Sequence, residues 1–295
     1  MKPLDSNVIA WSVHLACLLE VTAEKPGNVS WRKGFRDMRF IDFMASAVAI
    51  GPAMRDAPRS PVGETILRAV RDTRRFVETN TNLGMVLLLA PLAKAAGQGH
   101  HQGFRSGVRK VLDRLTVEDA RLAYEAIRLA SPGGLGRSDS FDVRDSGVDV
   151  TLLEAMTIAR ERDAVSREYA TGFEITFEIG CPALQASWRD GHAFSDAIVQ
   201  TALTILAEVP DTLIARKEGV ETAHRVSERA KRVLGTGGAF SRPGREALKA
   251  FDQALRDEDH RLNPGTTADL TTASIFVFLI GAGGIEHFQD LVQRW

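Results

Sequence analysis

Apolar residues recur at three- and four-residue steps along most of this chain, which is the spacing of one face of an α-helix. The first such stripe runs from Val8 to Thr22 and follows two candidate N-caps, Asp5 and Ser6. The same periodicity predicts further helices over 40–54, 61–79, 83–96, 116–131, 151–162, 193–208, 218–234, 245–258 and 267–280. The pattern therefore predicts an all-α fold, a multi-helix bundle whose loops carry the chemistry.

One segment departs from this periodicity. Residues 173–179 alternate apolar and polar side chains, which is a strand signal. Glu174 and Glu178 nevertheless share a helix face, and an isolated strand would have no partner in an otherwise helical chain. A helix is therefore favoured here. With no repeat or interdomain linker visible, a single domain over 1–295 is expected, with 132–149 as its longest loop.

Composition narrows the function classes. The 295 residues are 44% apolar, which suffices for a large core, and 37 basic side chains balance 38 acidic ones. This balance argues against a nucleic-acid binder, and the most apolar stretch, 273–282, is too short to cross the ~30 Å of a bilayer. Cys17 and Cys181 stand far apart, so a reducing cytoplasm is the expected compartment. The sequence leaves open whether the protein forms a homo-oligomer.

The first polar segment follows the N-terminal helix at 24–28 and continues to 36–38. Lys25 offers a mobile cation, and Gly27, beside Asn28, permits close backbone approach to an anion. Asp37 adds a carboxylate. The alternative is a helix stop followed by a solvated, charged loop.

The second polar segment, 78–84, crowds Asn80, Thr81 and Asn82 at the start of a strongly apolar helix. Such residues are good N-caps, so helix initiation is the ordinary explanation. One cap needs only one of them, however, and the exposed N–H groups of a helix terminus suit a phosphate.

The third segment, 132–139, combines glycines with nearby aspartates at 142 and 145. Glycine backbone amides could cradle a phosphate and the aspartates could hold Mg²⁺. The segment lacks the Gly-Lys-Ser/Thr ending of a P-loop, and a mobile lid is the alternative.

The fourth segment, 211–217, holds a carboxylate, Asp211, and two cations, Arg216 and Lys217. This combination suits a metal ion with a polyphosphate. The alternative is a helix capped by Asp211 with a basic pair on the surface.

The fifth segment, 260–269, opens the most apolar helix in the chain. Thr266 as N-cap and Asp269 three residues later would form a capping-box-like pair. An aspartate at that terminus would repel a phosphate unless Mg²⁺ bridged them, so Asp269 is the strongest metal-ligand candidate. Gly265 and Thr267 complete the segment as candidate phosphate contacts.

No Ser-His-Asp order, HExxH, zinc spacing or GxGxxG fingerprint is visible, which disfavours hydride transfer and zinc hydrolysis. The ordered segments instead resemble the triphosphoribosyl-dephospho-CoA synthase family from about Glu20 to Phe278, closest in pattern to its archaeal-type branch. The landmarks are Lys25-Pro26-Gly27, Asp37-Met38 with Phe43, Asn80-Thr81 with Gly84, Asp211-Thr212 with Arg216, and Asn263-Pro264-Gly265-Thr266-Thr267-Ala268-Asp269-Leu270.

The resemblance implies an all-α transferase that uses ATP as ribosyl donor. The 2′-hydroxyl of dephospho-CoA attacks C1′ of the ATP ribose, adenine leaves, and the triphosphoribosyl group is transferred. That chemistry needs cations and Mg²⁺ for the triphosphate and a carboxylate for the hydroxyl proton or the oxocarbenium-like carbon. Lys25, Arg216 and Lys217 suit the phosphates, whereas Asp37, Asp211 and Asp269 suit the base or metal roles.

One departure concerns the second segment, which usually reads Asn-Thr-His-Lys-Gly in the citrate- and malonate-type members. Here Asn82 and Leu83 replace the histidine and the lysine. This change motivates a rival hypothesis, a ribosyl transferase of tetrahydromethanopterin-type cofactor synthesis. A non-catalytic nucleotide-binding helical protein and a Mg²⁺-dependent phosphohydrolase are two further alternatives.

Overall fold

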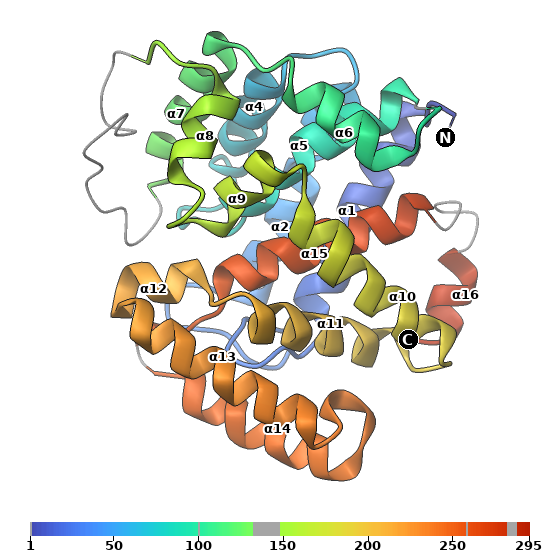
Figure 1. The fold of residues 1–295 in the computed structure, drawn as a ribbon, viewed down its shortest axis with the longest axis vertical. Helices are drawn as coiled ribbons and strands as arrows, with labels where there is room; N and C mark the ends of the chain where they lie inside the picture. The colour runs from blue at the N-terminus through green and yellow to red at the C-terminus, as the bar shows by residue number, and fades with distance from the viewer. Residues whose placement is uncertain (1, 100, 132–147, 258, 282–287) are drawn as a thin grey trace. The chain divides into compact units, whose positions relative to one another are not determined.

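The computed structural model describes residues 2–99, 101–131, 148–257, 259–281 and 288–295. Within these ranges the chain is helical, and its only β-type pairing is an isolated bridge between Ser30 and Lys33. The predicted all-α class is confirmed (Figure 1). The glycine- and aspartate-rich stretch proposed as a phosphate loop or lid falls on 132–147, outside the described residues.

The chain divides into two compact units, and their boundary falls within the first two helices, α1 (Ser6–Thr22) and α2 (Phe40–Ala49). Unit 1 comprises 1–15 and 42–174, and unit 2 comprises 16–41 and 175–295. The expectation of one domain over the whole chain stays a prediction. Each unit is described below by itself.

Unit 1 is an α-helical assembly in which α4 packs on α7 and α5 packs on α4, α6 and α9. Its helices are α3 (Gly51–Asp56), α4 (Val62–Thr73), α5 (Leu83–Gln98), α6 (Phe104–Leu112), α7 (Val117–Ala130), α8 (Leu152–Ala159) and α9 (Ala164–Thr171). The sequence Thr116-Val117-Glu118-Asp119 resembles an N-terminal capping pattern, and this prediction is confirmed, because Thr116 and Asp119 form a reciprocal capping box before α7.

Unit 2 is built around α15 (Gly265–Gly281), which is buried along most of its length. It packs against η1, α10, α11 and α12. The elements of this unit are η1 (Ile175–Gly180), α10 (Cys181–Arg189), α11 (Phe194–Glu208), α12 (Thr212–Glu218), α13 (Val220–Gly235), η2 (Gly238–Phe240), α14 (Arg242–Leu255), α15 and α16 (Phe288–Gln293).

The ambiguous segment after Gly172 is helical, as favoured from the sequence, but it is a π-helix, η1. The helices α6, α9, α10 and α16 were not predicted, and α12 was given only as the alternative for the fourth polar segment. They are short, and tertiary packing rather than a long periodic stripe defines them. The helix predicted to run to residue 79 ends earlier, at Thr73, because a turn over 74–77 leads into the second polar segment.

No single helix in the described part of the chain is long and apolar enough to span a membrane. The bent pair formed by α11 and α12 meets those length and composition criteria only when the two helices are taken together.

Candidate functional site

Three of the polar segments predicted from the sequence meet in unit 2. The loop after α1, the start of α12 and the loop before α15 are joined by side-chain hydrogen bonds. Asn28 reaches Asn263, Asp211 reaches Thr267, and Lys217 reaches His260. Segments more than 200 residues apart in sequence therefore form one polar region beside the N-terminus of α15.

Asp211 joins two helices at this region. Its Oδ1 accepts the N–H groups of Leu213 and Ile214 and so caps α12. Its Oδ2 accepts the backbone N–H and the hydroxyl of Thr267, at 2.7 and 2.8 Å, in the first turn of α15. The side chain is buried, with a relative exposure of 2%. Asp211 is thus a shared N-cap for two helices, and its hydrogen bonds leave little capacity for a metal ion.

The electrostatics of Asp211 are a balance of opposing effects. Burial raises the pKa of its carboxyl group, whereas hydrogen bonds from Thr267 and Ile214 and the charge of Arg216 oppose that rise. Since all four hydrogen bonds are donated to the carboxylate oxygens, they favour the ionised form.

The cap predicted for α15 is wrong. The first bond of this helix runs from the Ala268 N–H to the Pro264 carbonyl, so Thr266 lies inside the helix. The Thr266 hydroxyl instead accepts a hydrogen bond from Thr212. A distant carboxylate, that of Asp211, supplies the capping acceptor, and no local spacing could reveal this.

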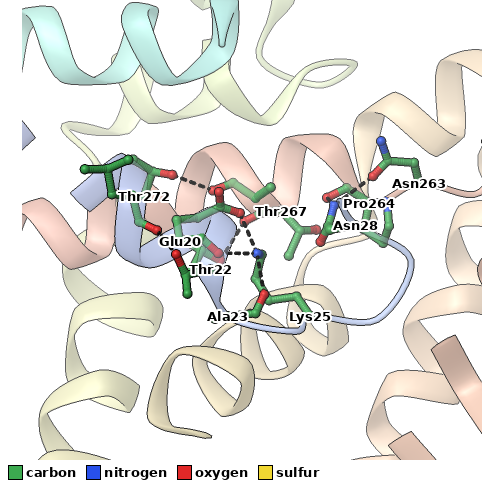
Figure 2. A network of polar contacts seen from close by, with 12 residues as sticks. Glu20, Thr22, Ala23, Lys25, Asn28, Asn263, Pro264, Thr267 and Thr272 are labelled. Carbon is green, nitrogen blue, oxygen red and sulfur yellow. Dashed lines mark hydrogen bonds and ion pairs between the residues drawn. The ribbon is translucent and has the colours of Figure 1, made fainter. Parts of the chain in front are cut away.

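Lys25 is not the mobile cation expected from the sequence. Its side chain is 1% exposed, and its Nζ lies 2.8 Å from Glu20 Oε1. The ammonium also donates to the carbonyls of Glu20 and Ala23 at the C-terminal end of α1 (Figure 2). Lys25 therefore caps the C-terminal end of α1, where a positive charge interacts favourably with the helix dipole. Glu20 is equally buried, and burial raises its pKa while the charge of Lys25 opposes the rise.

Gly27 and Asn28 are also held by protein groups. The Gly27 N–H donates to Asp252, so this backbone donor is already used. Gly27 has a φ of +76°, and a Cβ there would lie 2.9 Å from Leu255 and Pro264, so close packing requires glycine. The Asn28 amide donates to Asn263 and to the Pro264 carbonyl, as Figure 2 shows.

Asp252 and Arg256 of the α14 region were missed by the sequence interpretation. Asp252 accepts hydrogen bonds from Gly27, Lys33 and Arg256, and Arg256 also donates to the Asn28 carbonyl. Burial by itself would raise the pKa of Asp252, but these hydrogen bonds hold it below its ordinary value. Asp252 and Arg256 stand four residues apart, which is the spacing of an ordinary helix salt bridge, and nothing in that spacing indicates the distant loop at Gly27.

A second cluster contains the more accessible groups. His260 Nε2 lies 3.1 Å from Asp37 Oδ1, and His260 Nδ1 lies 3.3 Å from Lys217 Nζ. The Asp37 side chain is 53% exposed. Burial lowers the pKa of Lys217, and the charges of Asp37 and Asp257 oppose this effect. Neighbouring Arg216 is exposed, and Asp269 on α15 is partly exposed.

The predicted site residues of unit 2 thus fall into two groups. A buried scaffold positions the loops and consists of Lys25, Gly27, Asn28, Asp211, Thr266 and Thr267. A solvent-accessible set consists of Asp37, Arg216, Lys217 and Asp269, with Gly265 beside it at the start of α15. Only the accessible set can meet a ligand without rearrangement.

The second polar segment lies in unit 1 and caps α5. The Asn80 side chain accepts the N–H of Leu83. Thr81 shares a hydrogen bond with Ser46, and the Asn82 amide donates to Thr73. Thr81 and Asn82 are buried and bind Ser46 of α2 and Thr73 of α4 rather than capping α5, so helix initiation, the ordinary explanation, accounts for Asn80 only. Their predicted contact with ATP stays a prediction.

No group of three or more His, Cys, Asp or Glu side chains that could hold a metal ion is found among the described residues. Asp211 is saturated with hydrogen bonds, and Asp37 faces His260. The arrangement therefore does not fit a metal cage made by the protein alone. Mg²⁺ usually arrives with a phosphorylated substrate and takes only one or two protein carboxylates, so an ion of that kind would need no such cage.

Comparison with known proteins gives one consistent result. The model of the CitG family, described as ATP:dephospho-CoA triphosphoribosyl transferase, matches residues 6–287. A relative from Stutzerimonas stutzeri, provisionally named a 2-(5″-triphosphoribosyl)-3′-dephosphocoenzyme-A synthase, is 34% identical over 86% of this chain and 84% of its own. A Klebsiella pneumoniae protein with that name is 25% identical over 97% of this chain and 95% of its own.

A solved structure agrees with these relatives. The crystal structure of an Archaeoglobus fulgidus protein, provisionally named a triphosphoribosyl-dephospho-CoA synthase, superposes with a TM-score of 0.63 and 29% identity. The match covers 80% of this chain and 97% of the other. The fold and the sequence are therefore similar to proteins of the same family.

Proposed function

This chain belongs to the ATP:dephospho-CoA triphosphoribosyl transferase family, and from that premise we propose that it transfers the triphosphoribosyl group of ATP to dephospho-CoA. In the proposed reaction a hydroxyl oxygen of dephospho-CoA forms a bond to C1′ of the ATP ribose. The bond between C1′ and adenine breaks, and adenine leaves with the bonding electron pair. A carboxylate accepts the hydroxyl proton, and adenine takes up one proton.

The observation that carries the proposal is the accessible set beside the start of α15. Arg216 and Lys217 are consecutive on α12, and Lys217 is joined through His260 to the carboxylate of Asp37, while Asp269 stands on α15 of the same unit. A guanidinium and an ammonium can bind the oxygens of a triphosphate, and a carboxylate can accept a proton or stabilise a positive carbon. Asp37 and Asp269 are therefore the proposed base and charge-stabilising groups.

We assign the buried residues a positioning role. Asp211 fixes the starts of α12 and α15, and Lys25 fixes the end of α1. Preorganised loops of this kind keep charged groups in place without reorganisation during the reaction, which is a large term in enzymatic catalysis. Asn80 and Gly265 remain proposed contacts of the nucleotide.

Mg²⁺ is proposed as the ion of the ATP substrate, with Asp269 as its protein contact. When bound, the ion would neutralise charge on the triphosphate. The protein residues in turn orient the triphosphate and receive the hydroxyl proton. The reducing cytoplasm is the proposed compartment, in keeping with two buried, unpaired thiols at Cys17 and Cys181.

The acceptor is proposed from the relatives. The three described above are all named for the dephospho-CoA product, which favours dephospho-CoA over a pterin acceptor. The replacement of histidine and lysine by Asn82 and Leu83 concerns the start of α5, where Asn82 donates to Thr73. That contact gives no reason to assign a different acceptor.

The decisive assay incubates purified protein with ATP, Mg²⁺ and dephospho-CoA and separates the nucleobases and nucleotides. We expect stoichiometric adenine and a product heavier by one triphosphoribosyl group. Adenine released only with a pterin acceptor would move the activity to that substrate. Phosphate without adenine would indicate a phosphohydrolase, and nucleotide binding without turnover would indicate a non-catalytic protein.

A further inference from the structure

His260 connects two of the accessible charged groups and has no role in the function proposed above. It contributes one side chain to a three-residue cluster, Asp37–His260–Lys217, whose members come from three different segments. The His260 side chain is 17% exposed. Its Nε2 lies 3.1 Å from Asp37 Oδ1, and its Nδ1 lies 3.3 Å from Lys217 Nζ. A partly buried histidine thus lies between a carboxylate and an ammonium group.

The backbone at His260 is held in an unfavourable conformation. Its φ of +41° lies in the left-handed region, which side chains other than glycine rarely adopt. The Lys217 ammonium and the Asn263 N–H both donate to the His260 carbonyl, and the His260 N–H donates to Asp257. Strained residues of this kind persist where the surrounding contacts fix them, and they concentrate at functional sites.

The two partners of the ring decide which nitrogen carries its proton. An ammonium group only donates, so Nδ1 must accept from Lys217 and Nε2 must donate to Asp37. The ring also packs on Phe35, with centroids 4.9 Å apart, and Arg256 Cζ lies 5.6 Å from the centroid of the Phe35 ring. The orientation of His260 is therefore set by contacts on three sides.

We propose that His260 is a positioning residue that holds the Lys217 ammonium in place to bind an anionic oxygen of the triphosphate and keeps Asp37 beside it. A lysine side chain is flexible, so two hydrogen bonds to the imidazole and the carbonyl of one residue restrict where its charge can lie. An ammonium has three donors, and these two contacts leave capacity for a phosphate oxygen. This inference rests on the proposed function of the site.

The first test compares kinetic constants of His260→Phe, His260→Asn and a matched control, His192→Phe. Phenylalanine keeps an aromatic ring but removes both nitrogens, whereas the asparagine oxygen stands near the position of Nδ1. His192 is a partly exposed histidine of the same unit that stacks on Phe240, away from the cluster. We expect His260→Phe to raise the KM for ATP about tenfold and to lower kcat less, a loss of ground-state binding worth one hydrogen bond to a charge.

His260→Asn should recover most of the wild-type KM, and His192→Phe should leave it unchanged. A role limited to folding would instead lower the unfolding midpoint of His260→Phe without changing KM, and that result would overturn the proposal. An equal increase of KM in His260→Phe and His260→Asn would also overturn it, because the Lys217 contact would then not be the important one.

The second test does not depend on turnover. Nitrogen-15 NMR of the imidazole should show the Nε2–H tautomer in the wild type, and Lys217→Met should shift the Nδ1 resonance, because this nitrogen loses its donor while Asp37 still holds the proton on Nε2. A wild-type Nδ1–H tautomer would refute the proposed contact even if the enzyme were active. Conversely, failure of the wild type to release adenine would refute the proposed function, while the tautomer would still report on the cluster.

Discussion

Asp211 provides the sharpest test of the distinction between scaffold and accessible residues. From the sequence it is a candidate metal ligand or base, whereas the structure makes it the shared cap of α12 and α15. The two interpretations predict opposite patterns of stability and activity when the carboxylate is changed.

The expected cost follows from the hydrogen bonds. In Asp211→Ala each helix loses its capping acceptor, at about 1 kcal/mol per cap. The hydroxyl of buried Thr267 also loses this acceptor, at about 1 kcal/mol or more. The free energy of unfolding should therefore fall by about 3 kcal/mol. In Asp211→Asn the single remaining oxygen serves only one helix, so the expected loss is about 2 kcal/mol.

Urea unfolding followed by circular dichroism measures these losses, and adenine release measures activity. Asp163→Ala is a matched control, because Asp163 caps one helix, α9, where Asp211 caps two, and losing one cap costs about 1 kcal/mol. At a temperature where it is folded, Asp211→Asn should keep adenine release within about tenfold of wild type, since loss of a general base typically costs 10²–10⁴. Unchanged stability with activity reduced a thousandfold would refute the scaffold role.

Three further predictions concern the accessible set and the buried pairs. Asp269→Asn and Arg216→Ala should each lower kcat/KM by at least tenfold while shifting the unfolding free energy by less than about 1 kcal/mol, and normal turnover in both would contradict the proposed site. Lys25→Met should destabilise by about 3 kcal/mol because it leaves Glu20 buried without its partner, and a smaller loss in the double variant with Glu20→Gln would identify the pair as the cause. The pKa of Asp252 is lower in the folded protein than its ordinary value of 3.8, so the ionised carboxylate stabilises the fold above pH 3.8 and this stabilisation is lost as the pH falls through the folded-state pKa. The difference in unfolding free energy between wild type and Asp252→Asn should therefore shrink on acidification. A difference that does not change with pH would argue against the ion pairs.

The apolar periodicity was enough to predict the all-α class and most helices, because a stripe of buried side chains is a local property of the sequence. The capping box at Thr116 and Asp119 was equally local and is confirmed. The short helices α6, α9 and α10 escaped prediction because their stability comes from packing.

The ordered polar segments also indicated the family before any coordinates, and they supplied the candidate site residues, which stay a prediction. They could not separate residues that face solvent from residues that bind one another. Lys25 and Asp37 belong to one polar segment, yet one is buried against Glu20 and the other is 53% exposed.

The sequence by itself determined that this protein is helical, which loops are polar and which family pattern they follow. Only the tertiary structure decided that Asp211 caps a helix begun 54 residues later, that Asp252 holds the loop at Gly27, and that His260 joins Asp37 to Lys217. The reason is physical. Periodicity and capping depend on neighbours within a turn of helix, whereas hydrogen bonds between distant segments depend on how the helices pack, which no local spacing encodes.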